Sequence, residues 1–437
     1  MPENPLDIDW LAKAAVATPG ATALVDDDGV RLTYEELDAM ATDAARSAEG
    51  SGATAGDIRQ IEVDGADREL IGRLWGLWRL GVVPLLMDAN SPISTHAPER
   101  VKRWLAQRVP SVHTIVLTSG SSGNPRPVRL THGNVAAAVA ASTERIGNGY
   151  EDRWLLTLPL FHVGGLSVLW RSAAVGGSVV LHSKFDEGRV ADALRSGEVT
   201  VASLVPTMLY RLLDHDPGPY PSMRAVLLGG AAAQRELVER GLEAGFPILQ
   251  TYGMTETCSQ VATVVPGEAL QSLGTTGKPL RGVSVSTGEA GVGEIVVSGP
   301  TVSPGYLGEP DRTGGHNTGD IGYLDDNGRL VVLGRVDDMV VTGGENVYPQ
   351  RVADVLGRSR HVSRVEVVPV PDSEWGQALV AVVVGEESAL PRLEQWARDR
   401  LPNHEIPKHW IYVGRMPMLS GGKVDRVALA EIARRAP

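Results

Sequence analysis

Short apolar runs alternate with helix-length segments through the first half of the chain. The runs are rich in Val and Leu and are bounded by turn residues. Continuous apolar runs are typical of strands that are buried on both faces, and their alternation with helices indicates βα units. A largely parallel sheet is therefore predicted, with strands at residues 113–117, 154–158, 178–181, 199–205 and 225–228.

Two helices are predicted before these strands. Residues 32–37 open a helix that continues through an Ala-rich segment, and residues 68–80 place apolar side chains at helical spacing. A chain of 437 residues exceeds what one hydrophobic core usually organises, so two or more domains are expected. The predicted fold class is α/β.

The pattern changes from about residue 282. Gly-punctuated strands follow at 283–285 and 294–297, with a turn at residues 326–328, and they predict a small β-barrel-like lobe. The segment after Asp337 has about a hundred residues, which suits a small α+β domain. We therefore predict a large domain at 1–336 and a smaller one at 337–437.

Composition narrows the function classes. The chain is 43% hydrophobic and 22% charged, which is ordinary for a globular protein, and its net charge is −12 without any Lys/Arg block. These values exclude nucleic acid as the expected partner. No apolar stretch reaches the length of a membrane span, and the first residues lack the features of a signal peptide. The single cysteine, Cys258, fits a reducing compartment, so a cytoplasmic protein is expected.

Cys258 lies two residues after Glu256, which raises the hypothesis of a nucleophilic thiol. No base stands at a recognisable local spacing from it. Buried cysteines commonly serve as small apolar side chains. We therefore favour a packing role for Cys258.

A stretch dense in hydroxyls and glycines follows the strand predicted at 113–117. It reads TSGSSGNPRPV over residues 118–128. Because Gly120 and Gly123 lack a Cβ, the backbone can turn its N–H groups toward an anion, and the hydroxyls add donors. Asn124 and Pro125 stand where a Walker A loop requires Lys and Ser or Thr. Without further context, a flexible Ser/Gly connector is the alternative.

The loop and its continuation, TSGSSGNPRPVRLTHGN, resemble the phosphate loop of the adenylate-forming superfamily of acyl-CoA ligases, luciferases and adenylation domains. That family usually has Lys and Gly where this chain has Arg126 and Pro127. Arg keeps the charge and offers a planar donor fork, whereas Pro stiffens the turn and removes one N–H. The resemblance implies ATP or AMP contacts at Thr118, Ser119, Gly120, Ser121, Ser122, Gly123 and Arg126.

The segment QTYGMTE at 250–256 resembles the family's YGxTE motif and follows an apolar run, so it should lie at the carboxyl end of a strand, where α/β sheets bind ligands. The resemblance implies that Tyr252 and Gly253 contact the adenine site, that Thr255 touches the α-phosphate and that Glu256 binds Mg²⁺. A carboxylate oxygen suits a hard cation that bridges phosphates. The other wall of the adenine slot is implied at Gly229, Gly230 and Ala231.

Two later segments continue the resemblance. The sequence NTGD ends at Asp320, which in the family accepts from the ribose hydroxyls, although an Asp after Gly is otherwise commonly a turn residue. The segment GRVDDMVVTGGENVYP implies that Arg335 reaches the ribose, that Asp337 is the hinge, and that Gly343 and Gly344 line the channel for coenzyme A. The resemblance therefore implies an AMP-binding domain at 1–336 and a mobile lid at 337–437.

The segment PMLSGGKVDR resembles the family's C-terminal Pro-x-x-x-x-Gly-Lys motif. The chain has six lysines against thirty-five arginines, so a lysine at this position is notable. The resemblance implies that Lys423 contacts the carboxylate and the α-phosphate during adenylation, where a compact ammonium suits developing phosphate charge. A solvated loop charge is the alternative.

The segment LPLFHVGGLSVLWRS at 158–172 resembles the acyl-pocket region of the family. Amino-acid-activating members usually have Asp where this chain has His162, so a free amino acid is not expected. The sequences of this segment and of TYGMTETCSQ are most similar to those of the o-succinylbenzoate–CoA ligases of menaquinone synthesis. A second carboxylate on the substrate would need donors, because burying it unpaired is prohibitive. The candidates are His162, Ser167 and Arg171, the last two lying four apart on one helix face, with a solvated charge as the alternative for Arg171.

The resemblance implies a two-step reaction on a small-molecule carboxylic acid. ATP with Mg²⁺ gives an acyl-AMP and pyrophosphate, and coenzyme A then displaces AMP; the implied catalytic residues are Lys423, Thr255, Glu256 and His162. The alternatives are another aryl- or acyl-CoA ligase, a carrier-protein-loading adenylation enzyme, or a non-catalytic nucleotide-binding module. The sequence leaves open the acyl identity and the oligomeric state, a homodimer included.

Overall fold

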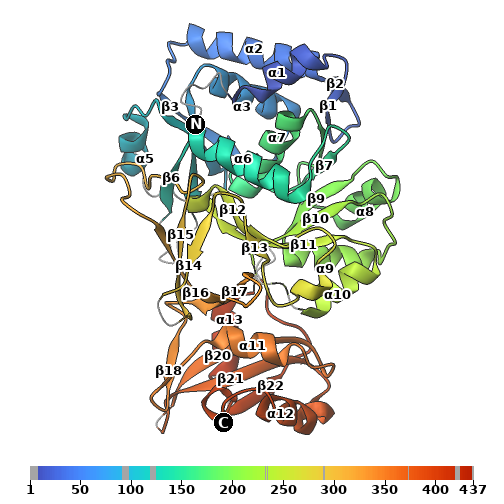
Figure 1. Cartoon of the computed structure of the whole chain (residues 1–437), viewed down its shortest axis with the longest axis vertical. Helices are drawn as coiled ribbons and strands as arrows, with labels where there is room; N and C mark the ends of the chain where they lie inside the picture. The colour runs from blue at the N-terminus through green and yellow to red at the C-terminus, as the bar shows by residue number, and fades with distance from the viewer. Residues whose placement is uncertain are drawn as a thin grey trace.

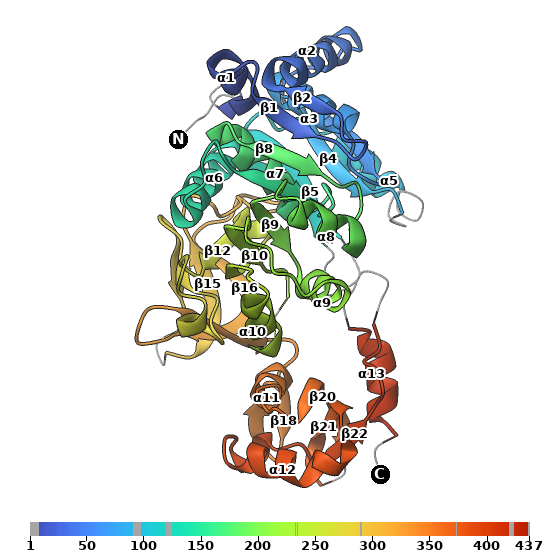
Figure 2. The same cartoon turned by 90° about the vertical axis from the view of Figure 1, so that its right-hand side faces the viewer.

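A computed structural model describes residues 8–90, 98–118, 125–231, 233, 235–288, 291–372, 374–418 and 424–435. A large N-terminal part carries β1 to β17, and a smaller C-terminal part carries β18 to β22 (Figure 1). The two parts lie one below the other, with the small one reached through a narrow connection (Figure 2). The large α/β domain and smaller C-terminal domain predicted from the sequence are confirmed.

The largest sheet has the strand order β13-β12-β11-β10-β9-β7-β8-β1-β2. Its central strands pair in parallel, as predicted, and antiparallel pairs occur only toward its two ends within the described residues. The strand predicted at residues 113–117 lies in a second sheet instead, so the prediction of a single sheet was wrong for that strand. Its strands are β1 (Thr22–Val25), β2 (Arg31–Thr33), β7 (Arg153–Leu156), β8 (Ser178–Leu181), β9 (Val201–Leu204), β10 (Ala225–Leu228), β11 (Ile248–Met254), β12 (Ser259–Thr263) and β13 (Lys278–Pro279).

Alternate residues of these strands enter two different cores. Trp154 and Leu227 belong to the core that contains α1, α3 and α7, whereas Leu155 and Val226 belong to the core under α8, α9 and α10. Burial on both faces explains why these strands read as continuous apolar runs. The covering helices are α1 (Trp10–Ala17), α3 (Arg68–Arg79), α7 (Val163–Val175), α8 (Glu187–Arg195), α9 (Pro206–His215) and α10 (Arg235–Glu243).

A second sheet has the order β3-β4-β5-β6, with β3, β4 and β5 parallel and β6 antiparallel to β5. The predicted helix at 32–37 begins at Tyr34, because Thr33 caps it and Glu36 completes a capping box. The elements are β3 (Ile58–Val63), β4 (Val83–Asp88), β5 (Val112–Thr118), β6 (Arg126–Thr131), α2 (Tyr34–Gly50), α5 (Pro98–Leu105) and α6 (His132–Ile146).

The Gly-punctuated region forms an antiparallel sheet in the order β14-β15-β16-β17. The predicted turn at 326–328 joins its last two strands, and Gly328 adopts φ +72° there, a conformation that disfavours other residues. The strands are β14 (Ser284–Ser286), β15 (Gly293–Ser298), β16 (His316–Leu324) and β17 (Leu330–Arg335). Short 3₁₀ turns η2 (Thr255–Thr257) and η3 (Leu270–Ser272) precede this region.

The small domain has its own hydrophobic core, which includes Val352, Val365, Leu379 and Leu393. A separate core is what the predicted α+β domain requires. Its elements are β18 (Val340–Thr342), β19 (Glu345–Val347), α11 (Pro349–Leu356), β20 (Val362–Asp372), β21 (Gly376–Gly385), η4 (Glu387–Ala389), α12 (Leu390–Arg398), η5 (Asn403–Glu405), β22 (His409–Tyr412) and α13 (Arg426–Ala433). None of the helices in the described part of the chain combines the length and the apolar character needed to cross a membrane.

A buried aromatic cluster joins the second sheet to α7. The ring of His113 on β5 stacks on Trp78 at 4.9 Å between centroids and meets Trp170 and His132 edge-on. Trp78 Nε1 donates to Thr114 Oγ1 at 2.9 Å. Burial holds the pKa of His113 well below its ordinary 6.5, and the nearby His132 adds to that shift. His113 is therefore neutral in the folded protein.

This burial predicts a loss of stability in acid. As the pH falls through 6.5, the unfolded chain takes up a proton on His113 that the folded chain does not, so the free energy of unfolding decreases; above 6.5 this residue has no effect. At about one pH unit below, the loss from His113 is about 1.4 kcal/mol.

Urea unfolding of wild type and of His113→Phe, followed across this range, measures the effect. The variant should lose less free energy of unfolding in acid by about that amount, and the two proteins should show the same dependence of this free energy on pH under alkaline conditions. The same dependence on pH in acid would contradict the assignment of a neutral His113.

Candidate active site

The predicted phosphate loop is carried between two paired strands. β5 ends at Thr118, β6 begins at Arg126, and these two residues are register partners. The predicted contacts Ser119, Gly120, Ser121, Ser122 and Gly123 lie outside the described residues. Thr118 and Arg126 therefore mark the two ends of that loop.

Arg126 contacts residues that the sequence did not identify. Its Nη2 donates to both carboxylate oxygens of Glu309 at 2.9 Å, and its guanidinium carbon lies 3.3 Å from the ring centroid of Tyr306. The hydroxyl of Tyr306 donates to Glu256 Oε1 at 2.8 Å. Tyr306 thus connects the predicted phosphate-binding Arg126 to the predicted metal ligand Glu256. The separation of 183 residues between Arg126 and Glu309 explains why no local pattern predicted the pair.

Thr255 and Glu256 lie on the 3₁₀ turn η2, directly after β11. Cys258 and Ser259 then adopt positive φ values of 52° and 90°, and the chain reverses into β12. A Cβ at Gly253 would lie 1.6 Å from the carbonyl oxygen of Ser259. Only glycine allows this reversal, so the fold itself requires a glycine at position 253, independently of any contact with the nucleotide.

The segment predicted as the second wall of the adenine slot follows β10, the parallel neighbour of β11. A Cβ on Gly229 would lie 2.7 Å from Cγ2 of Thr251, and Gly230 adopts φ +78°. Ala231, the next residue, is exposed. The structure thus places residues 229–231 beside the strand that carries Tyr252.

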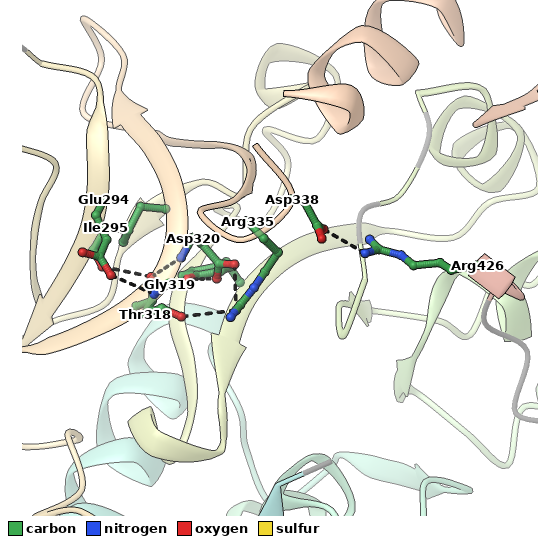
Figure 3. Close-up of polar contacts among 9 residues, drawn as sticks. Glu294, Ile295, Thr318, Gly319, Asp320, Arg335, Asp338 and Arg426 are labelled. Atoms are coloured by element: carbon green, nitrogen blue, oxygen red, sulfur yellow. Dashed lines mark hydrogen bonds and ion pairs between the residues drawn. The ribbon is translucent and has the colours of Figure 1, made fainter. Parts of the chain in front are cut away.

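Tyr252, Asp320 and Arg335, which the resemblance assigns to adenine and ribose contacts, meet one another in the structure. The hydroxyl of Tyr252 donates to Asp320 Oδ2 at 2.6 Å, and Arg335 Nη1 donates to Asp320 Oδ1 at 3.1 Å. Figure 3 shows the guanidinium of Arg335 also reaching the carbonyl oxygen of Thr318, at 3.2 Å. Burial raises the pKa of Asp320, although its bonds to Tyr252 and Arg335 oppose the shift. The three side chains form one polar cluster.

The structure shows why the middle position of the TGD sequence, residue 319, is a glycine. It adopts φ +73°, and a Cβ there would lie 2.8 Å from Nη2 of Arg335. Its N–H donates to Glu294 Oε1 at 3.2 Å (Figure 3). Gly319 therefore leaves room for the guanidinium of Arg335 beside Asp320. Asp320 on β16 and Arg335 on β17 are cross-strand partners.

The predicted acyl-binding residues lie at the N-cap of α7 and along that helix. His162 is the N-cap residue, is exposed, and packs its ring 4.6 Å from that of Phe161. Ser167 is buried and donates to the carbonyl oxygen of Val163 at 2.7 Å. Its oxygen retains the capacity to accept a hydrogen bond.

Arg171 is only 2% exposed, so the alternative of a solvated helix charge is wrong. Its Nη2 donates to Ser259 Oγ at 3.4 Å, its guanidinium lies 5.7 Å from the Trp154 ring, and its Nε has no hydrogen-bond partner among the described residues. Burial lowers the pKa of Arg171 to about 10, and the Cys258 thiol opposes the shift. A buried guanidinium without a carboxylate partner in the described chain can accept an anionic ligand.

Cys258 is fully buried, and burial raises the pKa of its thiol to about 12. A protonated thiol is a poor nucleophile. The packing role predicted from the sequence agrees with this environment.

The predicted coenzyme A residues lie elsewhere in this arrangement. The N–H of Gly343 donates to the carbonyl oxygen of Trp375 at 3.0 Å, and the hairpin β18–β19 is directed away from the large domain (Figure 1). Gly343 and Gly344 are therefore not brought to Tyr252 and Glu256.

The segment that follows the predicted hinge is joined to α13 by an ion pair. Asp337, the predicted hinge, is exposed, and the adjacent Asp338 accepts from Nη1 of Arg426 at 2.8 Å (Figure 3). Arg426 is the first residue of α13. Lys423, three residues earlier, lies outside the described residues.

Glu256 suits Mg²⁺ that arrives with a nucleotide. The described residues contain no group of three or more His, Cys, Asp or Glu side chains able to enclose a metal ion. Mg²⁺ is commonly bound through one or two carboxylates together with substrate phosphates. A single half-buried carboxylate near the phosphate-loop strand fits that mode of binding.

Comparisons with known proteins agree with this geometry. Residues 101–307 match the AMP-binding enzyme family, and residues 351–423 match the AMP-binding enzyme C-terminal domain. The chain is 38% identical to the 2-succinylbenzoate–CoA ligase of Listeria monocytogenes over 342 residues, which cover 76% of this chain and 72% of that protein.

Two solved structures extend the likeness to almost the whole chain. The o-succinylbenzoate CoA synthetase from Bacillus subtilis with its acyl-adenylate intermediate gives a TM-score of 0.82 at 30% identity, covering 96% of this chain and 97% of that one. The same enzyme with ATP and magnesium gives 0.81 at 30% identity, covering 97% and 99%. The chain belongs to the family of AMP-binding enzymes, the adenylate-forming superfamily that its motifs resemble.

Proposed function

We propose that this protein is an ATP-dependent acid–CoA ligase that converts o-succinylbenzoate to o-succinylbenzoyl-CoA. The observation that carries the proposal is Arg171, a buried guanidinium in the acyl segment with no carboxylate partner among the described residues. The relatives and solved structures named as ligases of this acid support it.

The contacts described above support the nucleotide site that we propose. Asp320 and Arg335 hold the ribose, and the hydroxyl of Tyr252 orients Asp320. Gly229, Gly230 and Ala231 line the adenine beside Tyr252, while the residues from Thr118 to Gly123, with Arg126, bind the phosphates. Glu256 holds Mg²⁺, which supplies charge neutralisation at the phosphate oxygens when bound.

The reaction proceeds in two steps. A carboxylate oxygen of the acid attacks the α-phosphorus of ATP, the bond to the β-phosphate oxygen breaks, and pyrophosphate leaves; Lys423 and Thr255 stabilise the charge on the α-phosphate. The thiolate of coenzyme A then attacks the acyl carbon, and AMP leaves. We assign Asp337 as the hinge about which residues 337–437 turn relative to residues 1–336, bringing Gly343 and Gly344 to the thiol's path.

The acyl site explains the choice of acid. o-Succinylbenzoate carries a ring carboxylate that is not activated, and Arg171 provides a buried cation for it, with Ser167 on the same face of α7. His162 lines the passage between this pocket and the α-phosphate. A cation already desolvated by the protein favours an acid that pairs with it over one that leaves it unpaired. A role in menaquinone synthesis and a cytoplasmic location accompany this proposal.

The substrate itself is the first test. Purified protein with ATP, Mg²⁺ and coenzyme A should turn over o-succinylbenzoate in preference to benzoate and to medium-chain fatty acids by at least about 10²-fold in kcat/KM, since a site built around a polar group penalises ligands that lack its partner. Products are identified by mass. Equal turnover of a simple monocarboxylate would reject this acid and leave a general acyl-CoA ligase.

Arg171 can be tested in the same assay. Arg171→Met should lower kcat/KM for o-succinylbenzoate by about 10²-fold, because the ring carboxylate loses its charge partner, whereas benzoate turnover should not fall. Benzoate serves as the internal control for folding. A parallel loss with both acids would show that Arg171 acts on the fold and not on the ring carboxylate.

Lys423 is tested by separating the two half-reactions. Lys423→Ala should reduce acyl-AMP formation by about 10²-fold or more, since one charge contact to the transition state is lost, while thioester formation from supplied acyl-AMP largely persists. Pyrophosphate release and thioester product are measured separately. Lys278→Ala, which removes an exposed lysine of the large domain, is the matched control. Normal acyl-AMP formation by Lys423→Ala would refute the role.

A further inference from the structure

Tyr306 is held by backbone contacts from both sides. It forms an isolated β-bridge with Val128 of β6, and the following N–H, that of Leu307, donates to the carbonyl oxygen of Pro127 at 2.8 Å. On the other side, the N–H of Ser303 donates to the carbonyl oxygen of Glu256 at 2.8 Å. The segment 303–307 therefore fixes Tyr306 between the phosphate-loop strand and η2.

The hydroxyl of Tyr306 acts on one oxygen of a predicted metal ligand. It donates to Glu256 Oε1 at 2.8 Å, so one carboxylate oxygen is anchored and Oε2 remains to be presented to a cation. A hydrogen bond of this kind restricts the rotation of the carboxylate about its terminal torsion, which is otherwise broad. Groups that orient a ligating carboxylate contribute strongly to metal affinity.

Arg126 lies over the ring of Tyr306. Its guanidinium carbon is 3.3 Å from the ring centroid, and Glu309 accepts from its Nη2 at 2.9 Å through both carboxylate oxygens. A planar guanidinium can stack on an aromatic ring and bind a carboxylate at the same time, whereas a lysine ammonium is a point charge. The replacement of the family's usual lysine by Arg126 therefore suits a contact with Tyr306.

We propose that Tyr306 is a positioning residue for Mg²⁺: its hydroxyl orients the carboxylate of Glu256, and the Arg126–Glu309 pair holds its ring in place. This inference rests on the proposed function, because it takes Glu256 as the magnesium ligand. It assigns a role to Tyr306 and Glu309, and it gives Arg126 an action on the metal site that passes through Tyr306.

Tyr306→Phe removes only the hydroxyl. Calorimetric titration of ATP should show binding about 10- to 100-fold weaker than wild type with Mg²⁺ present, and unchanged binding with EDTA, while the thermal midpoint stays within the scatter of wild type. Tyr323→Phe, the same change at another half-buried tyrosine, should match wild type throughout. Unaltered Mg²⁺-dependent binding by Tyr306→Phe overturns the proposal, and so does an equal loss with EDTA.

Arg126→Lys tests the second contact. It should weaken Mg²⁺-dependent ATP binding by less than about tenfold in wild type, and it should add nothing in the Tyr306→Phe background, because two residues that act through one contact are not additive. A loss that is the same in both backgrounds, with or without Mg²⁺, would show that Arg126 acts on the phosphates alone and not through Tyr306, and would remove it from the positioning role.

Glu256→Gln separates this inference from the function beneath it. If Glu256→Gln leaves Mg²⁺-dependent ATP binding intact, the metal assignment in the proposed function fails and the role of Tyr306 fails with it. If Glu256→Gln abolishes that dependence while Tyr306→Phe does not change it, only the positioning role fails.

Discussion

The close packing of segment 303–309 against β6 and η2 is the contact on which the candidate site depends. Three backbone hydrogen bonds join it to its neighbours: Ser303 to Glu256, Leu307 to Pro127, and Arg129 to Gly305. These bonds bring together strand β6 of the second sheet, the turn η2 that follows β11 of the largest sheet, and the connection between β15 and β16. Without that junction, Arg126, Tyr306 and Glu256 would belong to separate parts of the molecule.

Local cations compensate for a chain whose net charge is −12. Arg126 and Arg335 are each paired with a carboxylate, at Glu309 and Asp320, and both stand where the proposed function puts the nucleotide. Arg171 differs, because it is buried and has no carboxylate partner in the described chain. An anion that enters beside Arg171 would therefore restore the charge balance that burial disturbs. This difference separates the acyl site from the nucleotide site in chemical terms.

The small domain does not stand in the arrangement that we propose for the second step, the formation of the thioester. The hairpin β18–β19 is directed away from the large domain (Figure 1), while the Asp338–Arg426 pair ties the segment after Asp337 to the start of α13. Both residues of this pair belong to residues 337–437, so the pair moves with the small domain when that domain turns about Asp337 and does not tie it to the large domain. The proposed second step, with Gly343 and Gly344 at the site, requires such a turn.

The apolar runs by themselves predicted the central strands of the largest sheet, because burial on both faces demands continuous Val and Leu. The density of glycines and hydroxyls predicted a phosphate loop at residues 118–128, whereas the role of Asp320 was predicted only through the resemblance to the adenylate-forming superfamily. The burial of Arg171 and the contacts of Arg126 with Glu309 and Tyr306 were decided only by the tertiary structure. Arg171 and its partner Ser259 are 88 residues apart in the chain, and Arg126 and Glu309 are 183 residues apart. Hydrophobic periodicity reports which face of an element is buried, but the side chain met there depends on how distant elements pack.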